Sequence, residues 1–226
     1  MRMRVTVRIG GSVVASPLNP RLIDGYASTI RVLRQAGHEL AVVVGGGSIS
    51  REFIKAAQEV GLNEEAQDEV AISISRVIAQ MLAIRIGGLE WKRIPTTLEE
   101  AVETLRERGV VVMGGLKPGM TTDTVAALLA SKIKADMIVK ATDQEGIYTK
   151  DPKKHPDAEK LDELTFNELI EHLESKRHKA GIHQIIDPEA VKILRKSRIK
   201  TVVVNGFDPE NIIRALEGEK IGTVIS

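Results

Sequence analysis

Three glycine clusters in this 226-residue chain each follow a short apolar segment that is predicted to be a β-strand. They are Gly10-Gly11-Ser12 after residues 4–9, Gly45-Gly46-Gly47-Ser48 after residues 40–44, and Gly114-Gly115 after residues 110–113. One glycine pair after a strand is ordinarily a turn, but turns do not require clustered glycines at three places. A loop without side chains lets backbone N–H groups approach a phosphate. The repeated pattern therefore favours a ligand with several phosphate groups.

A fourth element with suitable chemistry is ATDQEGIYTKDP, residues 141–152, which follows a predicted strand at 136–140. Its hydroxyl, carboxylate and aromatic side chains suit a nucleoside, although a loop with a capping aspartate is the simpler interpretation. Neither the G-x-x-x-x-G-K-[ST] phosphate loop nor the G-x-G-x-x-G dinucleotide motif occurs in the chain. The sequence therefore disfavours a P-loop ATPase and a Rossmann dehydrogenase.

The elements that must position these loops alternate between strands and helices. Besides the strands already named, residues 200–204 form a clear strand pattern, and residues 90–94 and 223–225 form weaker ones. Helices are predicted at residues 20–36, 48–60, 63–86, 97–108, 122–134, 166–174 and 208–216. The alternation predicts an α/β fold with a mostly parallel central sheet and helices on both faces, which is a three-layer sandwich. In such sheets ligands bind beyond the carboxyl ends of the strands, where the glycine clusters are expected.

Composition excludes several classes of function. Apolar residues make up 42% of the chain and charged residues 28%, as in a globular protein, and the net charge of +1 gives no reason to expect nucleic acid as a partner. The absence of cysteine excludes disulfides and thiolate metal sites. The N-terminal apolar run is too short for a signal peptide, and no segment is expected to approach membrane-spanning length. These features predict a cytoplasmic protein that does not associate with membranes.

The segment from 148 to 190 differs from the rest because charged residues and prolines are concentrated there. It is interpreted either as the start of a second lobe or as a mobile lid. The five histidines of the chain form no constellation that predicts catalysis or metal binding.

Taken in order, these motifs resemble the amino acid kinase family over essentially the whole chain. The matching stretches are IGGS (9–12), VVVGGGSISREFI (42–54), Asp68 with the helix that carries Arg76, MGGLKPGMTTDTVAALLA (113–130), ATDQEGIYTKDP (141–152), KAG (179–181) and IDPEAVKILRKSRIKTVVVNG (186–206). The glycine motifs are family-wide. The PGMTTDTVAALLA and DQEGIYxxDP runs are more similar to the archaeal branch of the family that phosphorylates UMP.

The resemblance implies an activity and an organisation. The implied reaction is transfer of the γ-phosphate of MgATP to UMP, giving ADP and UDP for pyrimidine nucleotide biosynthesis. Mg²⁺ is then expected to arrive with ATP, and no metal site of the protein's own is expected. The implied organisation is a single domain, residues 1–226, with two lobes, of which the nucleotide-donor lobe spans roughly 136–226. Relatives of this branch are typically homohexamers, so a homo-oligomer is expected.

The resemblance also implies two adjacent binding sites along the strand edge. The residues implied for ATP are Gly10, Gly11, Gly47, Arg51, Thr142, Asp143, Tyr148 and Asp151. Those implied for UMP are Gly46, Asp68, Leu116, Lys117, Pro118, Gly119, Met120, Thr121 and Thr122. The residues implied for catalysis are Arg8, Arg51, Asp123 and Lys179. No general base is required, because the acceptor is an ionised phosphate and catalysis consists of positioning and charge stabilisation.

Four charged residues have competing interpretations. The family's first motif commonly has lysine where this chain has Arg8, and the rigid guanidinium fork is not equivalent to a lysine point charge. If Arg8 does not reach phosphate, cationic help must come from Arg51 or Lys179. Arg51 is predicted in the first turn of a helix, where the helix dipole disfavours a cation. A bound anion between Arg51 and the helix N-terminus would explain this position. Asp123 is either an ordinary acid of a first helical turn or orients a cation, and Lys179 is more simply part of a solvated basic run.

Further alternatives concern the role of Asp143, the identity of the acceptor, whether the protein is an enzyme, and the role of one helix. Relatives often have asparagine at the position of Asp143, so this carboxylate either binds the nucleotide differently or brings a metal closer. The acceptor is alternatively isopentenyl phosphate, carbamate or acetylglutamate, although isopentenyl phosphate kinases have a histidine shortly after the glycine triplet, and residues 48–51 have none. Aspartate is disfavoured as acceptor because aspartokinases carry a regulatory extension and this chain ends at Ser226. Outside the enzymes, the alternative function is that of a relative that binds nucleotide without catalysing a reaction.

The helix at 63–86 is either a dimer surface or a cover for the sheet.

Overall fold

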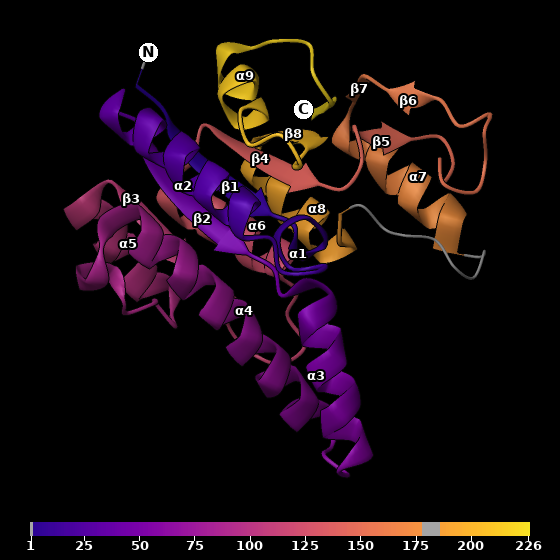
Figure 1. The fold of residues 1–226 in the computed structure, drawn as a ribbon. Coiled ribbons are helices and arrows are strands. Elements are labelled where there is room, and N and C mark those ends of the chain that lie inside the picture. The colour runs from indigo at the N-terminus through magenta and orange to yellow at the C-terminus, as the bar shows by residue number, and fades with distance from the viewer. Residues whose placement is uncertain (1, 178–185) are drawn as a thin grey trace.

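The structure is a computed structural model that describes residues 2–177 and 186–226. Its strands are β1 Arg4–Ile9, β2 Glu39–Val44, β3 Val110–Met113, β4 Met137–Thr142, β5 Ile147–Tyr148, β6 Lys160–Leu161, β7 Glu163–Leu164, β8 Lys200–Asn205 and β9 Thr223–Ile225. Its helices are α1 Gly11–Val14, α2 Pro20–Gln35, α3 Gly47–Glu59, α4 Glu64–Gly87, α5 Leu98–Arg108, α6 Thr122–Ile133, α7 Phe166–Arg177, α8 Pro188–Ser197 and α9 Asn211–Glu217, with a 3₁₀ turn η1 at Leu89–Trp91. Figure 1 shows how the helices surround the sheet.

The central sheet has the order β3-β2-β1-β4-β8-β9-β7. All pairs from β3 to β8 are parallel, and only β9 runs antiparallel to β8. The short strands β5 and β6 form a separate antiparallel pair. This arrangement confirms the predicted α/β fold with a mostly parallel sheet.

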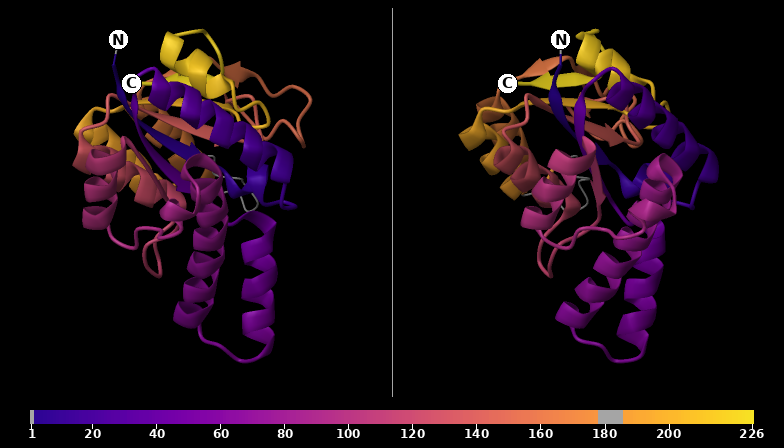
Figure 2. Two further views of the ribbon diagram at one scale, coloured as in Figure 1. Left: turned by 60° about the vertical axis from the view of Figure 1, so that its left-hand side comes forward. Right: turned by 90° about the vertical axis from the view of Figure 1, so that its left-hand side faces the viewer.

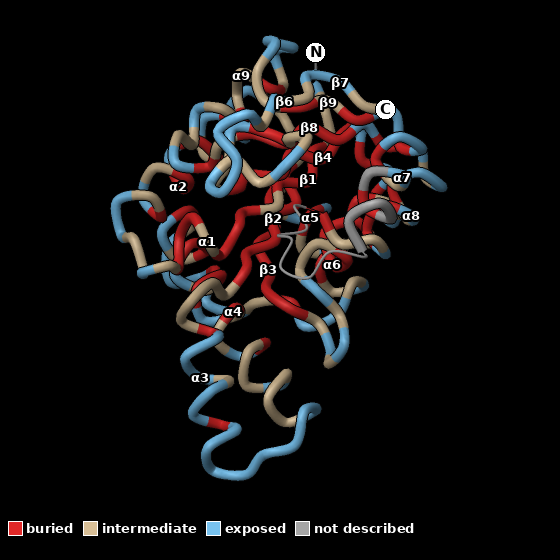
Figure 3. Tube along the Cα trace, turned by 90° about the vertical axis from the view of Figure 1, so that its right-hand side faces the viewer, coloured by how far each residue is buried: buried red, intermediate tan, exposed pale blue. Residues whose placement is uncertain are grey.

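Each face of the sheet is buried under a different set of helices, because successive side chains of a strand point to opposite faces. One face, with Val5, Val7 and Ile9 of β1, packs under α1, α2, α4 and α9. The other face packs under α5, α6, α7 and α8. The burial of the strands between these two layers is visible in Figure 3. The three-layer sandwich is therefore confirmed, and the even-numbered residues of β1 face α6.

Helices α3 and α4 form a long hairpin whose distal ends extend away from the sheet (Figure 2). By length and composition alone α4 is long and apolar enough to cross a membrane, so the expectation that no segment approaches that length is wrong. In this fold α4 packs against α2, α3, β2 and β3. The side of α4 that packs beside the sheet buries apolar residues such as Ile78 and Leu82, whereas Val77 and Met81 stay exposed.

One predicted element was misread, and others were missed. Residues 90–94 do not form a strand; they include the end of η1, because Trp91 packs against the backbone of Gly87 and the guanidinium groups of Arg34 and Arg108 each lie 5.4 Å from its ring centroid. Helix α8 was not predicted, although Asp187 accepts a hydrogen bond from the backbone N–H of Glu189 and Pro188 occupies the first turn. Asp-Pro is a typical helix start, and its signal was hidden by the polar segment before it.

Candidate active site

The three glycine clusters meet at the carboxyl edge of the sheet, because β1, β2 and β3 are parallel neighbours. The loops after β1 and β2 interlock. A Cβ atom on Gly11 would lie 2.1 Å from the backbone nitrogen of Gly47, and one on Gly47 would lie 2.3 Å from the carbonyl oxygen of Gly11. Gly47 also has a φ of +61°, a conformation that favours glycine. Close backbone approach therefore explains these glycines directly.

The interlocked loops present unused backbone donors. The N–H groups of Gly11, Gly46 and Gly47 make no hydrogen bond with any residue in the described part of the chain. Gly11 and Gly47 each begin a helix, where N–H groups have no intrahelical partner. Backbone donors at helix starts are a typical binding place for a phosphate oxygen.

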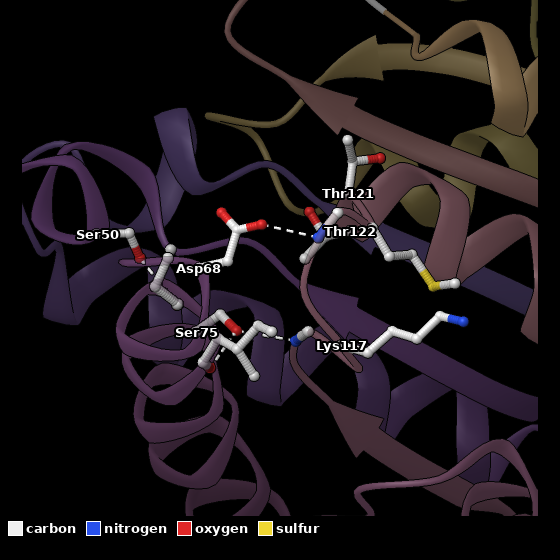
Figure 4. A pocket seen from close by; sticks show the side chains of 12 residues that line it. Ser50, Asp68, Ser75, Lys117, Thr121 and Thr122 are labelled. Carbon is white, nitrogen blue, oxygen red and sulfur yellow. Dashed lines mark hydrogen bonds between the residues drawn. The ribbon is translucent and has the colours of Figure 1, made fainter. Parts of the chain in front are cut away.

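A pocket of about 400 Å³ opens beside these loops, between the base of the α3–α4 hairpin and the loop at 114–121 (Figure 4). Its lining includes Gly46, Asp68, Lys117, Gly119, Met120, Thr121 and Thr122 from the residues implied for UMP. Leu116 and Pro118 belong to the same loop but do not line the pocket. Ser50, Ala71, Ile72, Ser75 and Gly115 complete the lining and were not among the predicted residues.

Polar contacts fix the loop that closes this pocket. Asp68 accepts a hydrogen bond from the backbone N–H of Gly119 at 2.7 Å, and Ser75 accepts one from Gly115 at 2.8 Å. Arg76 donates from Nε to the carbonyl oxygen of Gly115 and from Nη2 to that of Leu116. Arg76 therefore supports the loop from behind, whereas Asp68 lines the pocket.

A second pocket, of about 590 Å³, lies at the carboxyl end of β8. It is lined by Glu145, Tyr148, Lys160, Val204, Asn205, Asp208, Asn211, Arg214, Lys220, Ile221 and Gly222. Only Tyr148 was among the residues implied for ATP. Of the others, Glu145 belongs to the predicted loop 141–152 but was not among the residues implied for ATP, and Lys160 is in β6. The rest come from the segment that runs from the carboxyl end of β8 through α9 to the approach to β9, where the sequence carries no glycine cluster comparable to the first three.

The remaining residues implied for ATP lie on the loop after β4, with different surroundings. The Thr142 hydroxyl donates to Asp143 at 3.3 Å, and the Ser12 hydroxyl donates to the same carboxylate at 3.5 Å. Lys153 pairs with Asp143 at 2.8 Å; although burial raises the pKa of Asp143, this lysine holds it below its usual value. Asp151 accepts a hydrogen bond from the backbone N–H of Lys153 and stabilises a turn. Asp143 therefore lies beside the glycine loop of β1, whereas Asp151 has a local structural contact.

Between the two pockets lies a cluster of three charged side chains. Arg8 and Lys140 are register partners on β1 and β4, and both face α6. Lys140 Nζ lies 2.5 Å from each carboxylate oxygen of Asp123, and Arg8 Nε lies 2.6 Å from one of them. Arg8 Nη2 also donates to the Thr122 hydroxyl at 2.9 Å. Arg8 thus contacts a residue that lines the 400 Å³ pocket, and Lys140 was not among the residues predicted for the site.

The environment of this cluster sets its protonation. Burial, together with the neighbouring Arg8, lowers the pKa of Lys140 to about 8 despite the opposing effect of Asp123. Burial raises the pKa of Asp123, but the charges of Arg8 and Lys140 outweigh it and hold the pKa below its usual value. Asp123 is therefore ionised at neutral pH and orients two cations, which is one of the two interpretations left open by the sequence.

The other two implied cations have different placements. Arg51 is exposed in the first turn of α3 and makes no ion pair within residues 2–177 or 186–226. It does not line the 400 Å³ pocket. Lys179 lies outside the described residues.

Comparison with known proteins shows which family the chain belongs to. The model of the amino acid kinase family matches residues 3–205. The chain belongs to the amino acid kinase family. It is 42% identical over 224 residues to the uridylate kinase of Archaeoglobus fulgidus, covering 99% of this chain and 100% of that one. It is 39% identical over 223 residues to the uridylate kinase of Methanothermobacter thermautotrophicus, covering 99% of both.

Solved structures of the family share the fold. The crystal structure of the Archaeoglobus fulgidus uridylate kinase superimposes with a TM-score of 0.87 at 41% identity, covering 99% of this chain and 100% of that chain. The UMP kinase of Bacillus anthracis superimposes with a TM-score of 0.81 at 23% identity, covering 99% of this chain and 96% of that one, which shows a common fold. The expected resemblance to the amino acid kinase family is therefore confirmed over the whole chain.

Replacement of Asp68 by asparagine is expected to weaken binding at the acceptor-side pocket. The carboxylate is the acidic side chain of the lining and also holds Gly119, so its loss removes a charged acceptor and loosens the loop. The Michaelis constant for the acceptor should rise about tenfold, with a smaller change in kcat. Glu69→Gln, which alters the exposed neighbour on the same helix, is the control. An unchanged Michaelis constant in Asp68→Asn would remove Asp68 from the site.

Proposed function

We propose that this chain is a UMP kinase, which transfers the γ-phosphate of MgATP to UMP and releases ADP and UDP. The observation that carries the proposal is the placement of two pockets on either side of the glycine loops, along one edge of the sheet. Phosphoryl transfer between two nucleotides requires this arrangement, because their phosphates must meet while their nucleosides lie apart. Relatives named uridylate kinase at full length support UMP as the acceptor.

In the proposed complex UMP occupies the 400 Å³ pocket, with Asp68 on its ribose and the loop at 116–122 around it. ATP occupies the 590 Å³ pocket, and its phosphates run past Asp143 to the interlocked glycine loops. The donor pocket is lined only by residues between 145 and 222, which supports the proposal of a donor lobe at roughly 136–226. Arg51 and Lys179 are proposed to contribute positive charge to the reaction.

Mg²⁺ is proposed to bind together with ATP. Within the described ranges no group of three or more histidine, cysteine or acidic side chains is placed to hold a metal ion. Ser12, Thr142 and Asp143 instead gather hard oxygen ligands, one of them a carboxylate, which fits a Mg²⁺ ion held mainly by nucleotide phosphates and water. Bound in this way, the ion supplies neutralisation of phosphate charge.

We further propose a cytoplasmic homo-oligomer, a hexamer as in the typical relatives, that contributes to pyrimidine nucleotide synthesis. Support for assembly comes from apolar side chains left exposed on the α3–α4 hairpin, among them Phe53, Val60, Leu62, Val77 and Met81. Light scattering during size-exclusion chromatography measures the assembly directly, and a monomer at micromolar concentration would contradict this part of the proposal.

The decisive experiment measures ADP formation from MgATP with UMP, CMP, AMP, isopentenyl phosphate, carbamate and acetylglutamate in parallel. Strong turnover with UMP is expected, because the pocket is sized for a nucleotide. Preferential turnover with another acceptor would replace UMP but keep the phosphotransfer. Binding of ATP without turnover on any acceptor would leave a nucleotide-binding protein and overturn the proposed activity.

A further inference from the structure

The Arg8–Lys140–Asp123 cluster has one carboxylate in direct contact with two cations, and the side chains are 15%, 7% and 11% exposed. A second acid, Asp187, also acts on Lys140 but forms no ion pair with either cation. Buried charges are ordinarily paired by contact, so the two cations have room for an anion that both hold directly. The neighbouring acid, Asp187 at the start of α8, is committed to the hydroxyls of Thr121 and Thr124 and to its own helix cap.

The cluster also has unused donors. An ammonium group has three N–H bonds, and Lys140 directs them to the two oxygens of Asp123 with no other partner in the described part of the chain. Arg8 donates a hydrogen bond from Nη2 to Thr122, while its Nη1 makes none within the described ranges; its buried Nε lies 2.6 Å from a carboxylate oxygen of Asp123 but without the geometry of a hydrogen bond. At least one donor on each cation is therefore available to a ligand.

The Arg8 guanidinium group points toward the glycine loops that follow β1 and β2. Arg8 Nη1 lies 3.1 Å from the position of a Cβ on Gly10, and Nη2 lies 3.4 Å from that of a Cβ on Gly45. Arg8 thus reaches the two interlocked loops where backbone N–H groups are also unused. Thr122, which holds Arg8, lines the acceptor pocket, so the cluster lies where the phosphates of donor and acceptor are proposed to meet.

We propose that Lys140 is a catalytic residue, which together with Arg8 contacts the oxygens of the transferring phosphoryl group while Asp123 positions both cations. This inference rests on the proposed function. It adds Lys140, from the neighbouring strand β4, to Arg8, the cation that was expected in the site. In the step, the bond from the γ-phosphorus to the β–γ bridging oxygen breaks with its electron pair remaining on ADP. A bond to a phosphate oxygen of UMP forms, and no proton is transferred.

The protonation of Lys140 gives a specific readout. The charged groups that face it are Arg8 from β1, Asp123 from α6 and Asp187 from the start of α8. Because the ammonium form is the one that stabilises phosphate charge, kcat/KM should fall as the pH rises above about 8. A bound phosphate should raise the pKa of Lys140, so ATP binding near pH 8 should take up about half a proton.

The test compares Lys140→Met, Lys140→Arg and the control Lys132→Met in the full-length protein. Lys132 also pairs with a carboxylate, Glu99, but at the far end of α6. Lys140→Met is expected to lower kcat about a hundredfold and to raise the Michaelis constant for ATP about tenfold, with that for UMP within about threefold, and Lys132→Met should leave all three unchanged. In Lys140→Arg, whose charge persists to high pH, the fall in kcat/KM above pH 8 should disappear.

Each arm can overturn the inference. A kcat within about threefold of the wild type in folded Lys140→Met, or an unchanged alkaline fall in Lys140→Arg, would exclude a catalytic role for Lys140. If Lys140→Met fails to fold, or Lys140→Arg is inactive, calorimetry of ATP binding at pH 8 in buffers of different ionisation enthalpy decides. Equal proton uptake in the wild type and Lys140→Arg would then refute it. Absence of UMP turnover in the wild type refutes the proposed function alone, because ATP binding tests Lys140 independently.

Discussion

Replacing Gly47 with alanine should reduce phosphoryl transfer at least about a hundredfold, because an added methyl group forces apart the two loops that are proposed to hold the phosphates. The Cβ would lie 2.3 Å from the backbone oxygens of both Ala15 and Gly11, and backbone atoms cannot move aside as a flexible side chain can. The left-handed φ of +61° adds strain of about 1–2 kcal/mol to the folded state. Initial rates at saturating MgATP and UMP, together with urea unfolding, measure the two effects.

Gly61→Ala separates conformational strain from the steric clash. Gly61 has a φ of +83°, but a Cβ there meets no atom within 4 Å, and the residue follows α3 at the tip of the hairpin. This control should lose only the stability that the strain costs, about 1–2 kcal/mol, and keep its turnover. If Gly47→Ala retained the activity of Gly61→Ala, close approach of the loops would have no role in the reaction.

Removal of the Asp123 carboxylate should cause the largest loss of stability among the charged residues. Asp123→Ala leaves Arg8 and Lys140 buried side by side without a counterion, and breaking a buried pair in this way costs about 3–5 kcal/mol. The free energy of unfolding is measured by urea denaturation at pH 7. Restoring most of the loss by the double change Asp123→Ala with Lys140→Met would show that charge imbalance is the cause.

An exposed carboxylate provides the comparison. Glu99→Ala removes a partner of Lys132 that is 68% exposed, so the loss of stability should be far smaller than at Asp123. The effect at Asp123 should also depend on pH in a defined direction. Its native pKa is lowered, so its contribution is present above the unfolded pKa of about 3.9 and is lost as the pH falls through the native value. The difference between wild type and Asp123→Ala should therefore shrink in acid, and a constant difference would contradict the assigned ion pairs.

Much of the fold was predictable because the local signals agree with the tertiary arrangement. Unbroken apolar runs such as 41–44 and 201–204 belong to strands that are covered on both faces, and Asn19 and Asn63 cap the helices that they were predicted to begin. The prediction for residues 90–94 failed because Trp91 is buried in a 3₁₀ turn with the guanidinium groups of Arg34 and Arg108 near its ring, and these residues lie in other segments of the sequence. Propensity carries no information about such a partner.

The candidate site divides in the same way. Glycine clusters are visible in the sequence because their chemistry is local, and they lie together once the strands are parallel. Lys140 was missed because a charged residue within the apolar run 137–141 acquires a role only through its register with Arg8 and the approach of Asp123 from another layer. That single lysine among apolar neighbours was the available signal. The lining of the donor pocket was hidden for a similar reason, since Tyr148, Asn205 and Gly222 converge only in the folded chain.

The strand order has a consequence for synthesis on the ribosome. Strand β1 is made first but lies between β2, which follows soon after it, and β4, which is completed only at Thr142. At about 5–20 residues per second, roughly 5–20 s separate the completion of β2 from that of β4. During that interval the edge of β1 that will pair with β4 has no partner strand. Its unpaired backbone N–H and C=O groups are open to association with other nascent chains. Rapid early pairing of β1 with β2, and of β2 with β3, under α2 and α4 would leave only one edge of β1 exposed.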